Sequence, residues 1–170
     1  MTSAFKPLRV GFLGVGSIAK YHADVLNTVG HIVYAGCATS ASSTRWHEFE
    51  SLAPQVIWQP TGQALLNNPN VDAIISCLPW NITETWLPEL LATEKPVLIE
   101  KPIALSSVAL ISALPSCSNY PHNKYVGYNR RFYKTVQILK NRVAKGGVKT
   151  VEITIPENIY GLSSTYGPEI

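Results

Sequence analysis

A glutamate, a lysine and a proline stand in succession at residues 100–102, directly after the apolar run Val97–Ile99. A carboxylate accepts hydrogen bonds from hydroxyl groups, and an ammonium beside a bound carbonyl can polarise it and supply a proton. At the carboxyl end of a buried strand, Glu100 and Lys101 are therefore candidates for acid–base chemistry. Pro102 restricts the backbone conformation just after the strand. The plainer alternative is an ordinary charge pair at a strand end.

Three small residues are spaced as G-x-G-x-x-A at Gly14, Gly16 and Ala19, between an apolar run and a segment of helical length. The first glycine permits a tight turn, the second lets a pyrophosphate approach the backbone, and the small third residue lets helix pack on strand. The anion then lies on the helix N-terminus, at Ser17 and Ile18. The pattern predicts a dinucleotide site, and a tight turn of another α/β protein, such as a methyltransferase, is the alternative.

The segment after the second predicted strand bears on which dinucleotide binds. An Asp or Glu about 20 residues past the glycine turn would accept from the ribose 2′-hydroxyl of NAD. No carboxylate occurs between Gly30 and Glu48, where the chain instead offers serines, a threonine and Arg45. Because hydroxyls and a cation suit a 2′-phosphate, we expect NADP in preference to NAD, unless this is merely a polar loop. The predicted cofactor contacts at this strand end are Cys37, Ala38 and Thr39.

The composition favours one globular domain, because the chain has 170 residues, of which 46% are hydrophobic and 15% charged. The net charge of +3 comes from 14 basic and 11 acidic residues without a basic run, which argues against a nucleic-acid partner.

No stretch approaches the roughly 18 apolar residues that span a bilayer, and we expect a cytoplasmic protein with no membrane partner. Cysteines at 37, 77 and 117 are too few and too scattered for a disulfide framework or a metal site.

Short apolar runs alternate with segments of helical length along most of the chain. Such runs are typical of strands buried on both faces, and their alternation with helices predicts an α/β fold with a doubly wound parallel sheet. The expected strands are residues 8–14, 31–37, 55–58, 72–78, 96–100 and 124–128, and the expected helices are 17–29, 44–53, 62–68, 82–93 and 106–114. A further helix is expected at 133–147, then a strand at 148–156 whose open edge is a candidate for self-association.

Four segments, VGFLGVGSIAKYHADVL, LLNNPNVDAIISCLPWNITE, KPVLIEKPIAL and VGYNRRFYKTVQILKNRV, resemble the N-terminal half of the Gfo/Idh/MocA oxidoreductases in order and spacing. The similarity covers about residues 8–156, and its most specific parts are the Glu-Lys-Pro at 100–102 and GYNRRF at 127–132. The resemblance implies a Rossmann-type dinucleotide-binding fold. It also implies nicotinamide-dependent hydride transfer with sugars, inositols, related polyols or cyclic substrates.

The resemblance further implies roles for individual residues. Leu78, Pro79 and Asn81 match the loop that follows the ribose and phosphates of the cofactor, although Thr83 stands where many members have a histidine. Glu100 would accept hydrogen bonds from the nicotinamide ribose, and Lys101 would be the catalytic proton donor, its pKa tuned by partial burial. The Lys101–Pro102 bond is often cis in the family.

Two residues of GYNRRF, Asn129 and Arg131, resemble groups that line the cofactor and the interdomain cleft. For the arginines, capping a nearby helix or pairing with acids is the alternative. His22, one turn into the first helix, is expected to be a packing residue rather than a catalytic one.

Two domains follow from the resemblance: an NAD(P)-binding Rossmann domain at 1–148 and, at 149–170, the start of a truncated C-terminal domain for substrate binding and oligomerisation. The predicted function is that of the cofactor-binding domain of an NAD(P)-dependent oxidoreductase, whose substrate is a sugar- or polyol-like small molecule. Assembly of the protein into a homo-oligomer is a further possibility that the resemblance implies. The alternative is a nicotinamide-binding module without catalysis, either a sensor or a partner subunit.

Overall fold

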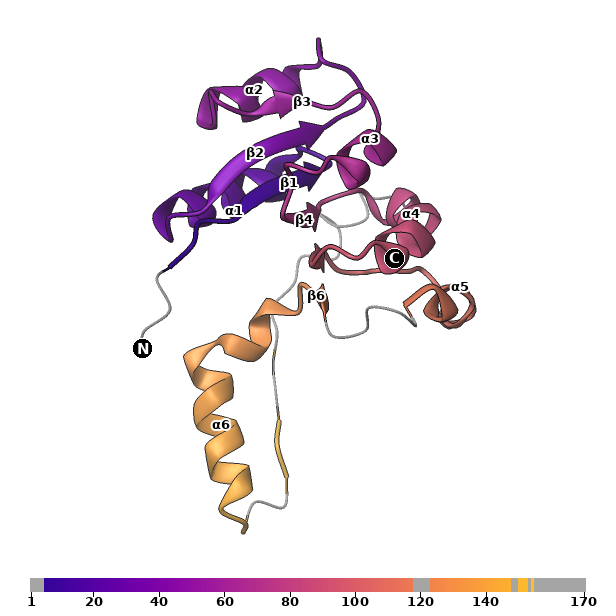
Figure 1. Ribbon diagram of the computed structural model, residues 1–170. Coiled ribbons are helices and arrows are strands. Elements are labelled where there is room, and N and C mark those ends of the chain that lie inside the picture. Colours follow the sequence, from indigo (N-terminus) through magenta and orange to yellow (C-terminus); the bar gives the residue numbers. More distant parts are fainter. Residues whose placement is uncertain (1–4, 118–122, 148–149, 153, 155–170) are drawn as a thin grey trace. The chain divides into compact units, whose positions relative to one another are not determined.

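The computed structural model describes residues 5–117, 123–147, 150–152 and 154. The chain divides after Tyr128 into two compact units, residues 1–128 and 129–170. The first unit contains a sheet and five α-helices among its described residues, and the second contains the helix α6 (Figure 1).

Six parallel strands form the sheet of the first unit, in the order β3-β2-β1-β4-β5-β6 (Figure 1). The order runs outward from β1 in one direction and from β4 in the other, so the topological switch point lies between these two strands. The predicted doubly wound parallel sheet is therefore confirmed. The strands are β1 Arg9–Leu13, β2 Ile32–Cys37, β3 Ile57–Trp58, β4 Ala73–Ser76, β5 Val97–Ile99 and β6 Lys124–Val126.

The helices that connect the strands start at residues suited to cap them. Ser43, Thr61 and Ser106 each accept a hydrogen bond from the backbone N–H three residues further on, which satisfies one of the free donors of the first turn. The helices of the first unit are α1 Ser17–Thr28, α2 Thr44–Leu52, α3 Gly62–Asn67, α4 Trp80–Ala92 and α5 Ser107–Ala113.

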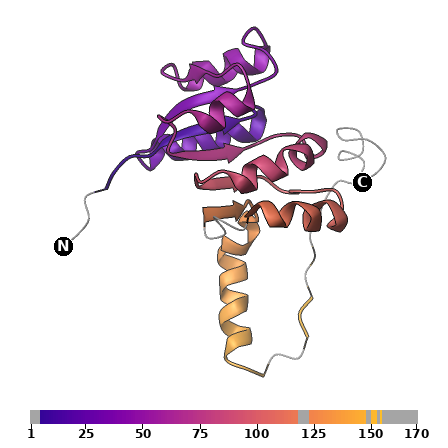
Figure 2. The ribbon, with the colours of Figure 1, turned by 45° about the vertical axis from the view of Figure 1, so that its right-hand side comes forward.

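Helices cover both faces of the sheet (Figures 1 and 2). On one face, Ala19 and Ala23 of α1 and Phe49 of α2 pack with Phe12 and Ile75 of the strands. On the other face, leucines of α3 and α4 pack with Ile74, Val97 and Ile99. The expected burial on both faces is confirmed for the central strands but wrong at the sheet edges, where Ile57 is 45% and Tyr125 57% exposed.

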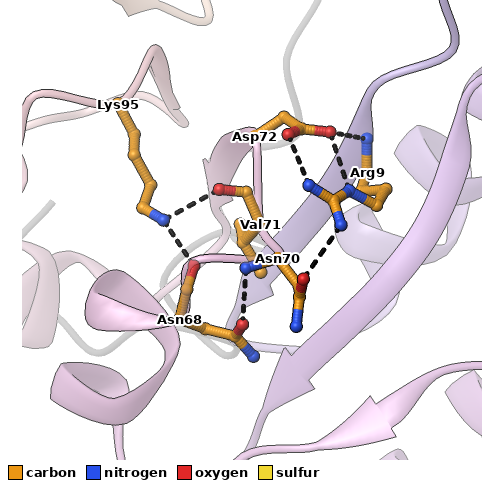
Figure 3. Close-up of polar contacts among 6 residues, drawn as sticks. All are labelled: Arg9, Asn68, Asn70, Val71, Asp72 and Lys95. Atoms are coloured by element: carbon orange, nitrogen blue, oxygen red, sulfur yellow. Dashed lines mark hydrogen bonds and ion pairs between the residues drawn. The ribbon is translucent and has the colours of Figure 1, made fainter.

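Charged side chains brace the amino ends of the strands (Figure 3). Arg9, which begins β1, donates from Nε and Nη2 to the two carboxylate oxygens of Asp72, at 3.1 and 2.9 Å. The ammonium of Lys95, just before β5, donates to the carbonyls of Asn68 and Val71 at 2.6 and 2.8 Å. These groups leave the carboxyl ends of the strands available for a ligand.

The second unit consists, in its described part, of a short 3-10 helix at Asn129–Phe132 and of α6, Lys134–Ala144. The helix expected at 133–147 ends at Ala144, and Gly146 and Gly147 follow it with φ angles of 77° and 82°, a conformation that favours glycine after a helix. The strand expected at 148–156 and the tail to residue 170 lie largely outside the described residues. The domain boundary at 148/149 and self-association through this strand stay predictions. Among the described residues, no helix is long and apolar enough to cross a membrane.

Candidate functional site

A cavity of about 310 Å³ opens at the carboxyl ends of β1, β2 and β4. This is the position, beside the switch point, where open α/β sheets bind their ligands. Seven of the predicted contacts line it: Gly14, Gly16, Cys37, Ala38, Thr39, Leu78 and Pro79. Its other lining residues are Leu13, Val15, Ser43, Arg45, Gly62, Cys77 and Trp86.

The glycine turn forms the floor of the cavity at the end of β1. Gly14 has a φ of +86°, which favours glycine, and its N–H donates to the carbonyl of Cys37 at 2.9 Å. A Cβ atom on Gly14 would lie 2.9 Å from the carbonyl oxygen of Cys77, so this turn fits closely between the ends of β2 and β4.

Gly16 differs from Gly14, because a Cβ atom there would meet nothing within 4 Å. Gly16 is also the N-cap of α1 and supplies no side-chain cap for its first turn. The first N–H groups of α1 thus lack a side-chain acceptor, and the space beside them suits an anion such as a pyrophosphate.

The wall after β2 contains one cation and no acid. Ser40 and Ser42 bond to each other at 2.8 Å, and Ser43 is engaged as the cap of α2. Arg45 lines the cavity, and none of the lining residues is an aspartate or glutamate. Among the polar groups expected to suit a 2′-phosphate, the serines thus form hydrogen bonds with neighbouring residues. Arg45 and Thr39 line the cavity.

The loop after β4 is held from within α4. Thr83 is buried, and its hydroxyl lies 3.1 Å from the carbonyl oxygens of both Leu78 and Pro79. A threonine hydroxyl has one proton and donates to one of these acceptors at a time. Thr83 thus fastens the backbone of the cavity wall.

Trp86 and Gly62 form a further wall that the sequence interpretation missed. Trp86 lies on α4 and Gly62 begins α3, and the indole occupies the space beside the glycine. No local pattern marks this contact, since the two residues are 24 positions apart and belong to different helices.

Glu100 follows β5 and lies at the neighbouring strand end. Its N–H donates to the carbonyl of Ser76 at 2.9 Å, and its Oε1 atom lies 2.8 Å from Nε2 of His22. The hydrogen bond with His22 lowers the pKa of Glu100, and a backbone hydrogen bond from Lys101 lowers it further. The expectation that His22 merely packs thus missed a contact. Its position, between Ala19 and Ala23 on the buried face of α1, could have signalled it.

Lys101 is exposed, in contrast to the partial burial expected for it, and the Lys101–Pro102 bond is cis. The Glu100 side chain pairs with His22 rather than with the Lys101 ammonium. Neither Glu100 nor Lys101 lines the cavity described above, which ends beside Leu78 and Pro79.

The other predicted cofactor contacts do not line the cavity. Ser17 and Ile18 are exposed in the first turn of α1, and Asn81 is exposed in the first turn of α4. Asn129 and Arg131 belong to the second unit, where the Arg131 guanidinium lies 5.6 Å from the ring centre of Phe132.

The buried thiols of the cavity are free cysteines. Burial raises the pKa of the Cys37 thiol, and burial together with the nearby charge of Glu100 raises that of Cys77. Both groups are therefore neutral at physiological pH and act as small apolar side chains.

Comparison with known proteins places this site in a family context. Residues 8–145 match the model of the oxidoreductase family with an NAD-binding Rossmann fold. An uncharacterised oxidoreductase, YrbE of Bacillus subtilis, is 25% identical over 150 residues, covering 85% of this chain and 42% of that protein. Myo-inositol 2-dehydrogenase of Thermotoga maritima is 27% identical over 143 residues, covering 83% and 42%. The chain thus spans less than half the length of these curated relatives.

Solved structures show the same architecture. A probable dehydrogenase from Thermotoga maritima superposes with a TM-score of 0.70 at 27% identity, covering 82% of this chain and 41% of the other. Myo-inositol dehydrogenase from Lactobacillus casei, solved with NAD(H) and myo-inositol, superposes with a TM-score of 0.75 at 22% identity, covering 84% and 42%. Because the family model matches residues 8–145, which is most of this chain, the chain belongs to the Gfo/Idh/MocA oxidoreductase family and contains its NAD-binding Rossmann domain.

Proposed function

We propose that this chain is the cofactor-binding part of an NAD(P)-dependent dehydrogenase or reductase that acts on a sugar- or polyol-like small molecule. The observation that carries the proposal is the cavity at the carboxyl ends of β1, β2 and β4, with the glycine turn as its floor. The names of the relatives, most of them inositol dehydrogenases, support the substrate class.

The cavity residues fit a dinucleotide. The open space beside Gly16 and the uncapped start of α1 would receive the pyrophosphate, with Ser17 and Ile18 supplying backbone N–H groups. Thr39 and Arg45 would face the adenosine ribose. The Leu78–Pro79 backbone, fastened by Thr83, would line the path toward the nicotinamide.

Glu100 and Lys101 would act at the reactive end. A bound nicotinamide would supply the site for hydride transfer, which this chain's side chains cannot themselves provide. Glu100 would accept hydrogen bonds from the hydroxyls of the adjacent ribose. The exposed Lys101 ammonium would polarise the substrate carbonyl and give it a proton, or take one from a hydroxyl in the reverse direction.

NADP is the proposed preference over NAD, with Arg45 as the group that distinguishes them. Arg45 lines the cavity where no acid does, and a guanidinium pairs strongly with a phosphate. Titrating the chain with NADPH and NADH by fluorescence tests this. Arg45→Met should weaken NADPH binding by roughly tenfold, the worth of a charge-assisted contact, and leave NADH binding within about twofold. Tighter binding of NADH by the unaltered chain would refute the preference.

The same titration tests the proposed function as a whole, since a chain that binds neither nucleotide at millimolar concentration is no cofactor domain. Catalysis is tested by following the production of NADPH from NADP, and of NADH from NAD, with polyols, myo-inositol among them. Lys101→Met should abolish any rate and keep cofactor affinity within about threefold, because the ammonium acts on the substrate. Binding without turnover on any polyol would favour the non-catalytic module.

A further inference from the structure

His22 and Glu100 meet across 78 residues of sequence at the carboxyl end of β5. Nε2 of His22 lies 2.8 Å from Oε1 of Glu100, and the two side chains are 23% and 15% exposed. A ring nitrogen that donates at this distance to a partly buried carboxylate forms a strong, directional hydrogen bond. The pair therefore restricts the orientation of the Glu100 side chain from the first helix.

Gly127 bounds the same carboxylate from the other side. A Cβ atom on Gly127 would lie 2.9 Å from Oε1 and 3.2 Å from Oε2 of Glu100. The φ of Gly127 is not positive, so the space rather than the backbone conformation requires a glycine. Three elements thus enclose the group: α1 through His22, the end of β5, and the residue after β6.

In the part of the chain that the structure describes, Lys101 and Cys77 also act on this carboxylate. The backbone N–H of Lys101 donates to it, the charge of Lys101 attracts it, and the neutral thiol of Cys77 lies close enough to sense its charge. Of these groups, His22 is the side chain in hydrogen-bond contact with it. An ionised carboxylate has about four acceptor positions, so lone pairs stay available for a further donor.

We propose that His22 is a positioning residue, which with Gly127 holds the carboxylate of Glu100 in one orientation as an acceptor for a ribose hydroxyl. This inference rests on the proposed function, because it assigns Glu100 to the bound cofactor. In this role His22 acts on the cofactor through Glu100, with which it forms its hydrogen bond. It acts by limiting the rotation of the Glu100 side chain before the cofactor binds. This reduces the loss of side-chain conformational entropy on binding.

The first test concerns the chain without cofactor. The carbon-13 signal of the Glu100 carboxyl, assigned by its loss in Glu100→Gln, is followed from pH 2 to 8. His22→Phe keeps a ring but removes the donor, so the titration midpoint of Glu100 should move upward. His22→Gln restores an N–H donor and should return the midpoint toward that of the unaltered chain.

A matched control comes from the second histidine–glutamate pair. His47 lies 3.6 Å from Glu50 on α2, with exposed side chains of 61% and 47%. His47→Gln should leave the Glu100 midpoint unchanged. If His22→Phe and His22→Gln shift the midpoint equally, or neither shifts it while circular dichroism shows a folded chain, His22 does not position Glu100.

The second test measures the affinity for NADPH and for NADH at pH 7. His22→Phe and Gly127→Ala should each weaken binding by roughly 3- to 10-fold, comparable to the loss of one hydrogen bond, and His22→Gln should stay within about twofold. Unchanged affinity in His22→Phe would overturn the role in binding. If the unaltered chain binds neither NADH nor NADPH, the proposed function fails, and the carboxyl titration still decides whether His22 holds Glu100.

Discussion

The indole ring of Trp86 fills the space in front of Gly62. A Cβ atom on Gly62 would lie 2.8 Å from Cζ2 of Trp86 and 2.9 Å from Cδ1 of Leu13, closer than real side-chain atoms approach. All three residues line the cavity at the strand ends. The width of the cavity at this wall therefore depends on the absence of one methyl group at the start of α3.

Gly62→Ala should displace Trp86 and disturb the cavity. We expect a loss of about 1–3 kcal/mol in the free energy of unfolding, as for overpacking of a core, although alanine favours a helix more than glycine does. The double variant Gly62→Ala, Trp86→Leu should recover most of that loss. Urea denaturation measures both, and a single variant as stable as the unaltered chain would show that the indole moves away freely.

The two glycines of the turn should respond differently to alanine. Gly14→Ala places a side chain at a φ of +86° and against the Cys77 carbonyl, and should cost about 2 kcal/mol or more in unfolding free energy. Gly16→Ala meets nothing within 4 Å and should change stability by less than about 0.5 kcal/mol.

Cofactor titration of Gly16→Ala then shows whether Gly16 matters for cofactor binding rather than for stability. The methyl group of Gly16→Ala would project where we place the pyrophosphate, so NADH affinity should fall by roughly tenfold or more in a folded protein. Unaltered affinity in this variant would mean that the phosphates lie elsewhere.

Thr83→Val removes the hydroxyl that fastens the Leu78–Pro79 loop. Because Thr83 is buried, we expect about 1–2 kcal/mol less unfolding free energy, together with weaker cofactor binding. Thr85→Val is the matched control, since Thr85 is exposed on the same helix and donates to the carbonyl of Ile82. Equal effects of the two changes would indicate a general helix effect and no special role for Thr83.

The Arg9–Asp72 pair should make stability depend on acid pH. Hydrogen bonds from the side chain and backbone of Arg9 lower the pKa of Asp72 from 3.8 to about 2. A depressed pKa means that the pair stabilises the fold fully above about pH 4 to 5, and that this contribution is lost as pH falls from 3.8 toward 2.

Asp72→Asn should therefore be less stable than the unaltered chain by about 1–2 kcal/mol at pH 7, a value reduced because the pair is partly exposed. The difference should shrink as the pH of the denaturation is lowered below 4. Glu50→Gln, which changes an exposed carboxylate, serves as control. A difference that stays constant down to pH 2 would contradict the assigned pKa.

The sheet and the glycine turn could be predicted from the sequence because both rest on local patterns. Apolar runs such as Val97–Ile99 that alternate with helices are typical of buried parallel strands, and the spacing of Gly14 and Gly16 indicates the turn. Most predicted strand ends lie one or two residues too far out, although those at Cys37, Trp58 and Lys124 agree with the structure. The exposure of the sheet edges was missed, because it depends on which strands pair.

The sequence by itself determined the family, the alternation of strands and helices that predicts a parallel sheet, and the residues that bend the chain at the end of β1, because these are visible as sequence patterns. Only the tertiary structure decided that His22 meets Glu100 and that Trp86 meets Gly62, because each pair joins different elements through side-chain packing. Sequence spacing carries no record of such distances. The walls and the charge of the site are therefore properties of the folded chain.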